Sequence, residues 1–352
     1  MNAAKTPPRQ LLGLAFITVT ILWSPLAQIR GQEVPLVLKD SVEVENMRSQ
    51  PFLGGAACDG EGNLYFRFFR NRAPASAPLL RLARDGRETV TFSLDQVPDE
   101  TVRGGSFEDY AVDLRGRVYL LTHVRQPDSE AQTAIVRFSR DGHYDSTIKI
   151  DASFIAWKLG VFPSGELLLS GLKEGQGKGE PAGVSAIGVF SSTGEVVKVF
   201  SPQEDVKLNY DGNRETSETE GLAAIGTSPI APGEDGNIYL MRPGSKASIY
   251  VISPAGTVVR RLAITPPHDG FRAWDMRIGG GNIVVEFVQK HDDTTRSDRV
   301  IYSIFDSEGT RVIDYLSSTE VGGHLACYSP NGFTFLAPSP SGRLAIRRAS
   351  LH

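Results

Sequence analysis

The chain has neither the excess of basic residues that is typical of proteins binding nucleic acid nor the repeated long apolar stretches that are typical of membrane proteins. Its 352 residues carry a formal net charge of -4 with 22% charged residues. It therefore lacks the basic excess that nucleic acid or an anionic membrane surface selects. No second apolar stretch of spanning length follows the one at the N-terminus. We expect no nucleic-acid partner and no membrane span in the mature protein.

The sequence also lacks the motifs of common catalytic sites. It contains no Gly-x-Ser-x-Gly elbow, and neither cysteine has a candidate base nearby in the sequence. Gly279-Gly280-Gly281 precedes a predicted strand rather than a helix, which argues against a phosphate-binding loop. The six histidines occupy different positions in the repeats described below, so they do not predict a ring of metal ligands.

The N-terminus does contain the three parts of a secretory signal. Two basic residues precede an apolar run from Leu11 to Trp23, and Ser24-Pro25-Leu26-Ala27 follows it. A spanning helix needs roughly 20 apolar residues, so the run is short for a membrane anchor, which is the alternative. We predict a signal peptide over residues 1–31, cleaved between 24 and 32, and export to the periplasm or the cell exterior.

One turn motif recurs six times along the chain. It consists of an apolar strand, a polar turn closed by glycine and a second apolar strand, as in Val112-Asp113-Leu114-Arg115-Gly116-Arg117-Val118-Tyr119. Glycine supplies the positive φ that closes such a turn without a Cβ clash. The long interval between Gly165 and Gly236 indicates an insertion. The closing glycines are Gly62, Gly116, Gly165, Gly236, Gly281 and Gly332.

A second turn motif lies between successive copies of the first. It ends in Gly86, Gly142, Gly194, Gly256 and Gly309, and another β-forming run follows each glycine. Each repeat therefore holds four strands. Repeats of this length with regularly spaced turns predict an all-β fold, a six-bladed β-propeller of four-stranded antiparallel blades, as a single domain over residues 32–352.

These motifs resemble the repeats of the NHL-like and TolB-like six-bladed propellers. The pattern V-D-x-x-G-x-V-Y followed by V-x-F-S-x-D-G, seen from Val112 to Gly142, is typical of NHL-like repeats. The resemblance covers nearly all of the mature chain. It implies the fold but not one function, because such propellers include scaffolds, ligand binders and a few enzymes.

The sixth repeat is one strand short. After Gly332 only two β runs remain before the chain stops. Either Val34–Leu38 or Ser41–Val44 could supply the outer strand of this last blade, which would close the ring without a covalent link and cover an exposed sheet edge. We expect one of these N-terminal segments to close the propeller.

The two cysteines fall near that closure. Cys58 and Cys327 lie at the ends of the innermost strands of blades one and six, and their offset by one residue permits a bridge between these neighbouring blades. An oxidising compartment would allow a disulfide that locks the ring. Two separate buried thiols are the alternative.

Candidate binding residues gather in the loops and strand starts that lead into the central channel. Their mixed charges could orient a ligand, and their aromatic rings could stack on a sugar or grip a partner chain, although interblade packing and solvation explain the same residues. A calcium site that includes Asp109 and Asp275 is a further alternative; otherwise we expect no cofactor. The candidates are Phe107, Glu108, Asp109, Trp157, Arg272, Trp274, Asp275 and His324.

Polar excursions lie at 125–131, 172–183, 201–221 and 289–299, and long loops on a rigid scaffold often carry binding. We therefore expect a non-catalytic propeller that binds a protein or glycan partner through one face of the disc. The first alternative is a metal-assisted channel enzyme, a lyase or lactone hydrolase. The second is a structural module of an envelope assembly.

Overall fold

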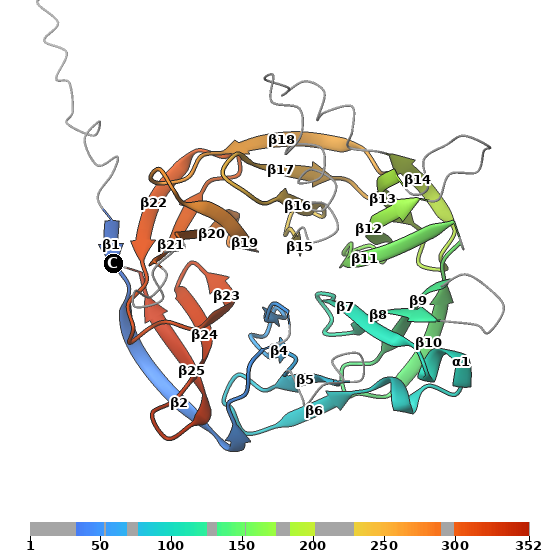
Figure 1. Ribbon diagram of the computed structural model, residues 1–352, viewed down its shortest axis with the longest axis horizontal. Coiled ribbons are helices and arrows are strands. Elements are labelled where there is room, and N and C mark those ends of the chain that lie inside the picture. Colours follow the sequence, from blue (N-terminus) through green and yellow to red (C-terminus); the bar gives the residue numbers. More distant parts are fainter. Residues whose placement is uncertain are drawn as a thin grey trace, which may run out of the picture.

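The fold is a ring of six small β-sheets, seen down its axis in Figure 1. The computed structural model describes residues 33–52, 54–68, 77–124, 132–151, 153–173, 184–200, 229–289 and 299–351. The predicted six-bladed propeller is confirmed. The predicted signal peptide and most of the four polar excursions lie outside the described residues.

Blades one to three each consist of four antiparallel strands in chain order from the channel outward. Blade one contains β3 (Ala57–Cys58), β4 (Leu64–Phe66), β5 (Leu79–Leu82) and β6 (Thr89–Phe92). Blade two contains β7 (Ser106–Val112), β8 (Val118–Val124), β9 (Gln132–Phe138) and β10 (Tyr144–Lys149). Blade three contains β11 (Phe154–Val161), β12 (Leu167–Lys173), β13 (Val184–Phe190) and β14 (Val196–Phe200). The short helices η3 (Leu94–Gln96) and α1 (Glu100–Arg103) join blades one and two.

Blades four to six follow the same plan. Blade four contains β15 (Ile230–Pro232), β16 (Ile238–Arg242), β17 (Ala247–Ile252) and β18 (Val258–Ile264). Blade five contains β19 (Arg272–Gly279), β20 (Asn282–Gln289), β21 (Arg299–Phe305) and β22 (Arg311–Leu316). In blade six, β23 (His324–Ser329), β24 (Gly332–Pro338) and β25 (Arg343–Ser350) are followed outward by β2 (Val37–Arg48), which precedes them in the chain.

The turn glycines adopt the conformation that the motifs require. Gly62 has φ 81° and Gly116 φ 76°, and the other closing glycines of both motifs also have positive φ. Each of these two turns is closed by a backbone hydrogen bond from the glycine N–H, as from Gly116 to the carbonyl of Asp113 at 2.9 Å. The side chain of Asp113 accepts further backbone N–H groups from Arg115 and Arg117. Turn chemistry therefore sets the spacing of the strands.

The N-terminal segment closes the ring, as expected. β2 pairs antiparallel with β25 and forms the outer strand of blade six, from Val37 opposite Ser350 to Arg48 opposite Arg343. A second contact was not expected: β1 (Glu33–Pro35) pairs parallel with β22 and adds a fifth strand to blade five. In Figure 1 the N-terminal segment runs along the outside of both blades. The chain start thus ties two consecutive blades together.

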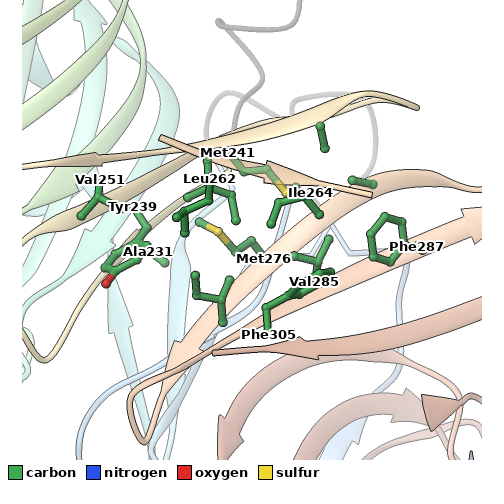
Figure 2. Packing of buried hydrophobic residues seen from close by; sticks show 14 of the residues in the cluster. Ala231, Tyr239, Met241, Val251, Leu262, Ile264, Met276, Val285, Phe287 and Phe305 are labelled. Carbon is green, nitrogen blue, oxygen red and sulfur yellow. The ribbon is translucent and has the colours of Figure 1, made fainter. Parts of the chain in front are cut away.

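The core lies between the blades. Inner strands such as β8 are apolar on both faces because each face packs on a neighbouring blade, whereas outer strands such as β18 alternate between buried and exposed residues. Figure 2 shows one such layer, in which Met276 and Phe305 of blade five pack with Tyr239 and Leu262 of blade four. Sheets that pack face to face in this way bury most large side chains.

Candidate functional site

A cavity of about 1500 Å³ occupies the central channel. Segments of all six blades line it, mainly the innermost strands and the turns that adjoin them. Figure 1 shows β7, β11, β15, β19 and β23 arranged around this centre. The lining includes basic and acidic side chains, so neither sign of charge dominates the cavity. It is the natural place in this fold for a ligand.

A register irregularity recurs in four of the innermost strands. Pairing with the second strand skips Glu108 in β7, Trp157 in β11, Trp274 in β19 and Ala326 in β23. A bulge of this kind changes which face the following side chains occupy. In β7, β11 and β19 the residue directly after the skipped one is charged: Asp109, Lys158 and Asp275 respectively, and all three line the cavity.

The predicted site residues divide into two groups. The first group lines the cavity and the second group does not. Phe107 is only 5% exposed and packs under the guanidinium of Arg67, whose Cζ lies 3.6 Å from the ring centroid. Interblade packing therefore accounts for Phe107. The cavity-lining residues are Cys58, Asp109, Arg272, Trp274, Asp275, His324 and Cys327; the others are Phe107, Glu108 and Trp157.

Glu108 is held beside the channel rather than in it. Its carboxylate accepts a hydrogen bond from the hydroxyl of Ser106 at 2.7 Å, and Nδ1 of His123 lies 3.6 Å away. The other ring nitrogen of His123 lies 2.6 Å from the carbonyl of Ala156 in blade three. This pair therefore links blades two and three.

The two cysteines meet where blades one and six adjoin. Their Cα atoms lie 5.6 Å apart, and the structure joins Cys58 of β3 to Cys327 of β23. This separation falls within the range that disulfides adopt. The geometry is compatible with the predicted bridge, whose oxidation state in the protein stays a prediction.

Asp109 is fully engaged by blade three. Its Oδ1 atom lies 3.4 Å from Nζ of Lys158, and Oδ2 accepts the backbone N–H of Leu159 at 3.0 Å. Both oxygens thus have partners on the neighbouring innermost strand. Tyr110, the next residue, donates its hydroxyl to the carbonyls of Gly55 and Tyr65 in blade one.

Arg277, which the sequence did not point to, is the central polar residue of the channel wall. Its guanidinium donates to Asp275 Oδ1 at 2.8 Å and to the carbonyl of Met276 at 2.7 Å. It also donates to the carbonyls of Ala56 in blade one at 2.6 Å, and of Leu325 and Ala326 in blade six at 2.8 and 3.3 Å. One side chain thus fastens blade five to blades six and one. Burial opposes its charge, but the negative charge of Asp275 and the hydrogen bond to it favour the charged form, and the pKa of Arg277 is raised.

Glu286 of β20 is the second residue that sequence reasoning missed. It lines the cavity, pairs across the sheet with Asp275 and stands next to Tyr302 of β21 on the other side. Burial, and then the charge of Asp275, raise its pKa from 4.5 to about 8, although Arg277 acts in the opposite direction. A carboxyl group within the apolar run Ile283–Val288 was the available signal. Groups with such shifts are candidates for binding or proton transfer.

His324 lies on the rim at the start of β23. Its ring centroid is 4.5 Å from that of Phe52, which also lines the cavity. Burial lowers the pKa of His324; Asp275 opposes this effect and Arg277 adds to it. The imidazole is therefore neutral at pH 7 and offers one donor and one acceptor.

Two structural searches bear on the remaining alternatives. Among residues 33–351, apart from the gaps named above, no group of three or more His, Cys, Asp or Glu side chains is placed to hold a metal ion. Within the same residues no helix is both long and apolar enough to cross a membrane. The calcium alternative gains no candidate ligand set from these residues and stays a prediction.

Comparisons with known proteins support the fold. No protein-family model matches the chain, and no curated protein matches it in sequence. Among solved structures, a protein of unknown function from Dyadobacter fermentans has a TM-score of 0.52 at 11% identity, over 90% of this chain and 99% of that one. At this identity the similarity shows the fold alone.

Two further solved structures match with lower scores. A luciferin-regenerating enzyme has a TM-score of 0.48 at 10% identity, over 89% of this chain and 95% of that one. A glucose dehydrogenase has a TM-score of 0.44 at 11% identity, over 89% of this chain and all of that one. At these scores neither structure says anything about the activity of this chain.

Proposed function

We propose that the protein binds a neutral, polyhydroxylated ligand of the carbohydrate class in the mouth of its central channel. The observation that carries this proposal is Trp274, whose side chain is on the cavity lining and 60% exposed. Sugars present apolar C–H faces that stack on aromatic rings such as an indole. Trp274 therefore supplies the stacking surface.

The polar residues beside Trp274 suit a ligand with many hydroxyl groups. Arg272 and Asp275 lie near Trp274 on the same strand, and His324 begins β23 of the adjacent blade six. A guanidinium donates, a carboxylate accepts and a neutral imidazole does both, which matches hydroxyls that are both donors and acceptors. The balance of charge in the lining favours a ligand without net charge.

A glycan array followed by calorimetric titration tests the proposal. We expect the purified protein to bind neutral mono- or oligosaccharides, and Trp274→Ala to weaken binding at least about tenfold, or about 1.4 kcal/mol. The matched control is Trp157→Ala, which removes the tryptophan at the same bulge position of blade three, outside the cavity lining. Equal losses for both variants, or no binding of any neutral sugar by the wild type, would refute the site.

The proposal also includes the export and the family resemblance that the sequence predicts. We infer a role outside the cytoplasm, where an oxidising compartment would favour the pairing of Cys58 with Cys327. The repeat motifs support a place among the NHL-like or TolB-like propellers. Expression with the native N-terminus, followed by N-terminal sequencing of the exported protein, tests export; a start at Met1 would contradict cleavage.

A further inference from the structure

Two carboxyl groups reach the cavity from adjacent strands on the same face of blade five. Asp275 of β19 and Glu286 of β20 are direct cross-strand partners. Side chains at such positions have Cβ atoms about 5 Å apart, so the two carboxyl groups can contact the same small ligand. Both residues line the cavity.

Arg277, which donates to Asp275, has no N–H group left for a ligand. A guanidinium has five N–H groups. Arg277 makes five hydrogen bonds, one to Asp275 and four to backbone carbonyls of blades five, six and one. Arg277 therefore stabilises the contact between blades five, six and one. A ligand at this place would hydrogen-bond to the two carboxyl groups instead.

The two carboxyl groups have oxygen atoms that make no hydrogen bond within the described part of the chain. Asp275 Oδ1 accepts from Arg277 and from the backbone N–H of Met276, whereas Oδ2 accepts nothing from the described part of the chain. Within the same part, the carboxyl group of Glu286 makes no hydrogen bond. Gly55 borders this oxygen, since a Cβ added there would be in van der Waals contact with Asp275 Oδ2 at 3.8 Å. Polar groups in partly buried positions ordinarily have partners, which points to a ligand or solvent here.

The groups that face Glu286 decide its protonation. Asp275 and Arg277 approach from β19 and Tyr302 from β21. The carboxylate of Asp275 pairs with the guanidinium of Arg277. For Glu286, burial disfavours the charged form and raises the pKa to about 8. At pH 7 the pair therefore consists of a carboxylate and a neutral carboxylic acid, which offers one acceptor and one O–H donor.

We propose that Asp275 and Glu286 select the ligand together: Glu286 donates its O–H to a ligand oxygen, Asp275 Oδ2 accepts a neighbouring ligand hydroxyl, and carboxylated sugars are rejected. This inference rests on the proposed carbohydrate site. A neutral diol satisfies both groups at once. A uronate would bring a second negative charge against Asp275, where like charges are costly in a partly buried site.

The experiment measures the affinity of full-length mature protein for methyl glycosides of glucose, galactose and mannose, and for the corresponding uronates, between pH 6 and 9.5. We expect neutral glycosides to bind at least tenfold more tightly than uronates at pH 7. Affinity should fall by up to about tenfold per pH unit above pH 8, because the ionised form of Glu286 cannot donate.

Two variants and one control separate the roles. Glu286→Gln keeps an uncharged donor of the same size, so it should retain affinity within about threefold and remove the decline above pH 8. Asp275→Asn should reduce the preference for neutral glycosides over uronates to less than about threefold. The control Glu108→Gln changes a carboxyl group on a channel strand outside the cavity and should leave the pH profile of wild-type binding unchanged.

The outcomes distinguish the two proposals. Neutral glycosides that bind with an affinity independent of pH, or a Glu286→Gln variant with the wild-type decline, overturn the selection by Asp275 and Glu286 but leave the carbohydrate site standing. Binding of uronates as tight as that of neutral glycosides would likewise overturn the selection by Asp275 and Glu286 and leave the carbohydrate site standing. A wild-type protein that binds no glycoside at any pH overturns both.

Discussion

The two sides of the channel treat equivalent acidic residues differently. On the side of blades two and three, Asp109 follows a bulge and has both oxygens engaged by Lys158 and Leu159. On the side of blades five, six and one, Asp275 follows the same kind of bulge, yet within the described residues neither its Oδ2 nor the carboxyl group of Glu286 beside it makes a hydrogen bond. On the first side the aspartate oxygens are used in contacts between blades, whereas on the second side carboxyl oxygens are left that can hydrogen-bond to a ligand.

The second side is also where the first strands of the described chain meet the last blades. There β2 completes blade six, β1 reaches blade five, Arg277 spans three blades and Cys58 adjoins Cys327. Polar contacts also join blades two and three, but each of them, such as His123 to the carbonyl of Ala156 or Asp109 to the N–H of Leu159, links two blades only. We define the seam as blades five, six and one. Because Arg277 makes five hydrogen bonds there, changes in the seam should cost more free energy of unfolding than matched changes in blades two and three.

The largest expected effect is loss of the closing strand. Removing residues 32–46 deletes β1 and most of β2, which leaves β25 as an open edge and exposes the outer face of blade six. We expect the whole domain to unfold, because an open ring also exposes its interblade core. Circular dichroism and a thermal scan measure this. A melting transition like that of the intact protein would contradict the closure.

Substitution of Arg277 ranks second. Arg277→Met removes five hydrogen bonds and leaves the partly buried Asp275 carboxylate unpaired, so we expect a loss of about 4 kcal/mol in the free energy of unfolding. The matched change Lys158→Met removes one partly exposed contact of 3.4 Å and should cost about 0.5 kcal/mol. Denaturation by urea measures both. Equal losses would show that the seam is not special.

The cysteine pair comes next. If bridged, Cys58 and Cys327 close a loop with a sequence separation of 269 residues, and their replacement by serine should lower stability by about 3 kcal/mol. Thiol titration of unfolded, unreduced protein must first show no reactive thiol. Two reactive thiols would refute the bridge, and reductant would then leave the melting temperature unchanged.

A pH-dependent effect tests Glu286. The folded protein holds this proton up to about pH 8, whereas the unfolded chain releases it near 4.5, so stability declines as pH rises between these values and is level above them. Glu286→Gln should therefore match the wild type at pH 4 and exceed it by up to about 4.5 kcal/mol at pH 8.5, since each unit of pKa difference corresponds to about 1.4 kcal/mol. A difference that does not change with pH would contradict a buried neutral acid.

The sequence was sufficient for the architecture because turns and strand patterns are local. Glycines at fixed places in the turns, and apolar runs between them, predicted six blades of four strands and a closing N-terminal strand. The added pairing of β1 with β22 was missed, since a three-residue parallel contact has no pattern of its own.

The site was predicted only in part because side-chain direction at a bulge is not local. Asp275 and Trp274 reach the cavity as expected, but the equivalent Trp157 and Glu108 do not line it. Arg277 donates to the carbonyl of Ala56, which is 221 residues away in the sequence, and no spacing rule anticipates such a contact. Glu286 could have been found as the single charge inside an apolar strand.

The central claim is that the seam side of the channel presents a neutral carboxylic acid beside a carboxylate. Carbon-13 NMR of the side-chain carboxyl groups, in protein labelled at glutamate, measures it directly, with Glu286→Gln to assign the signal. We predict that the Glu286 carboxyl titrates with a pKa of about 8. Titration complete near the ordinary value of 4.5 would contradict the account.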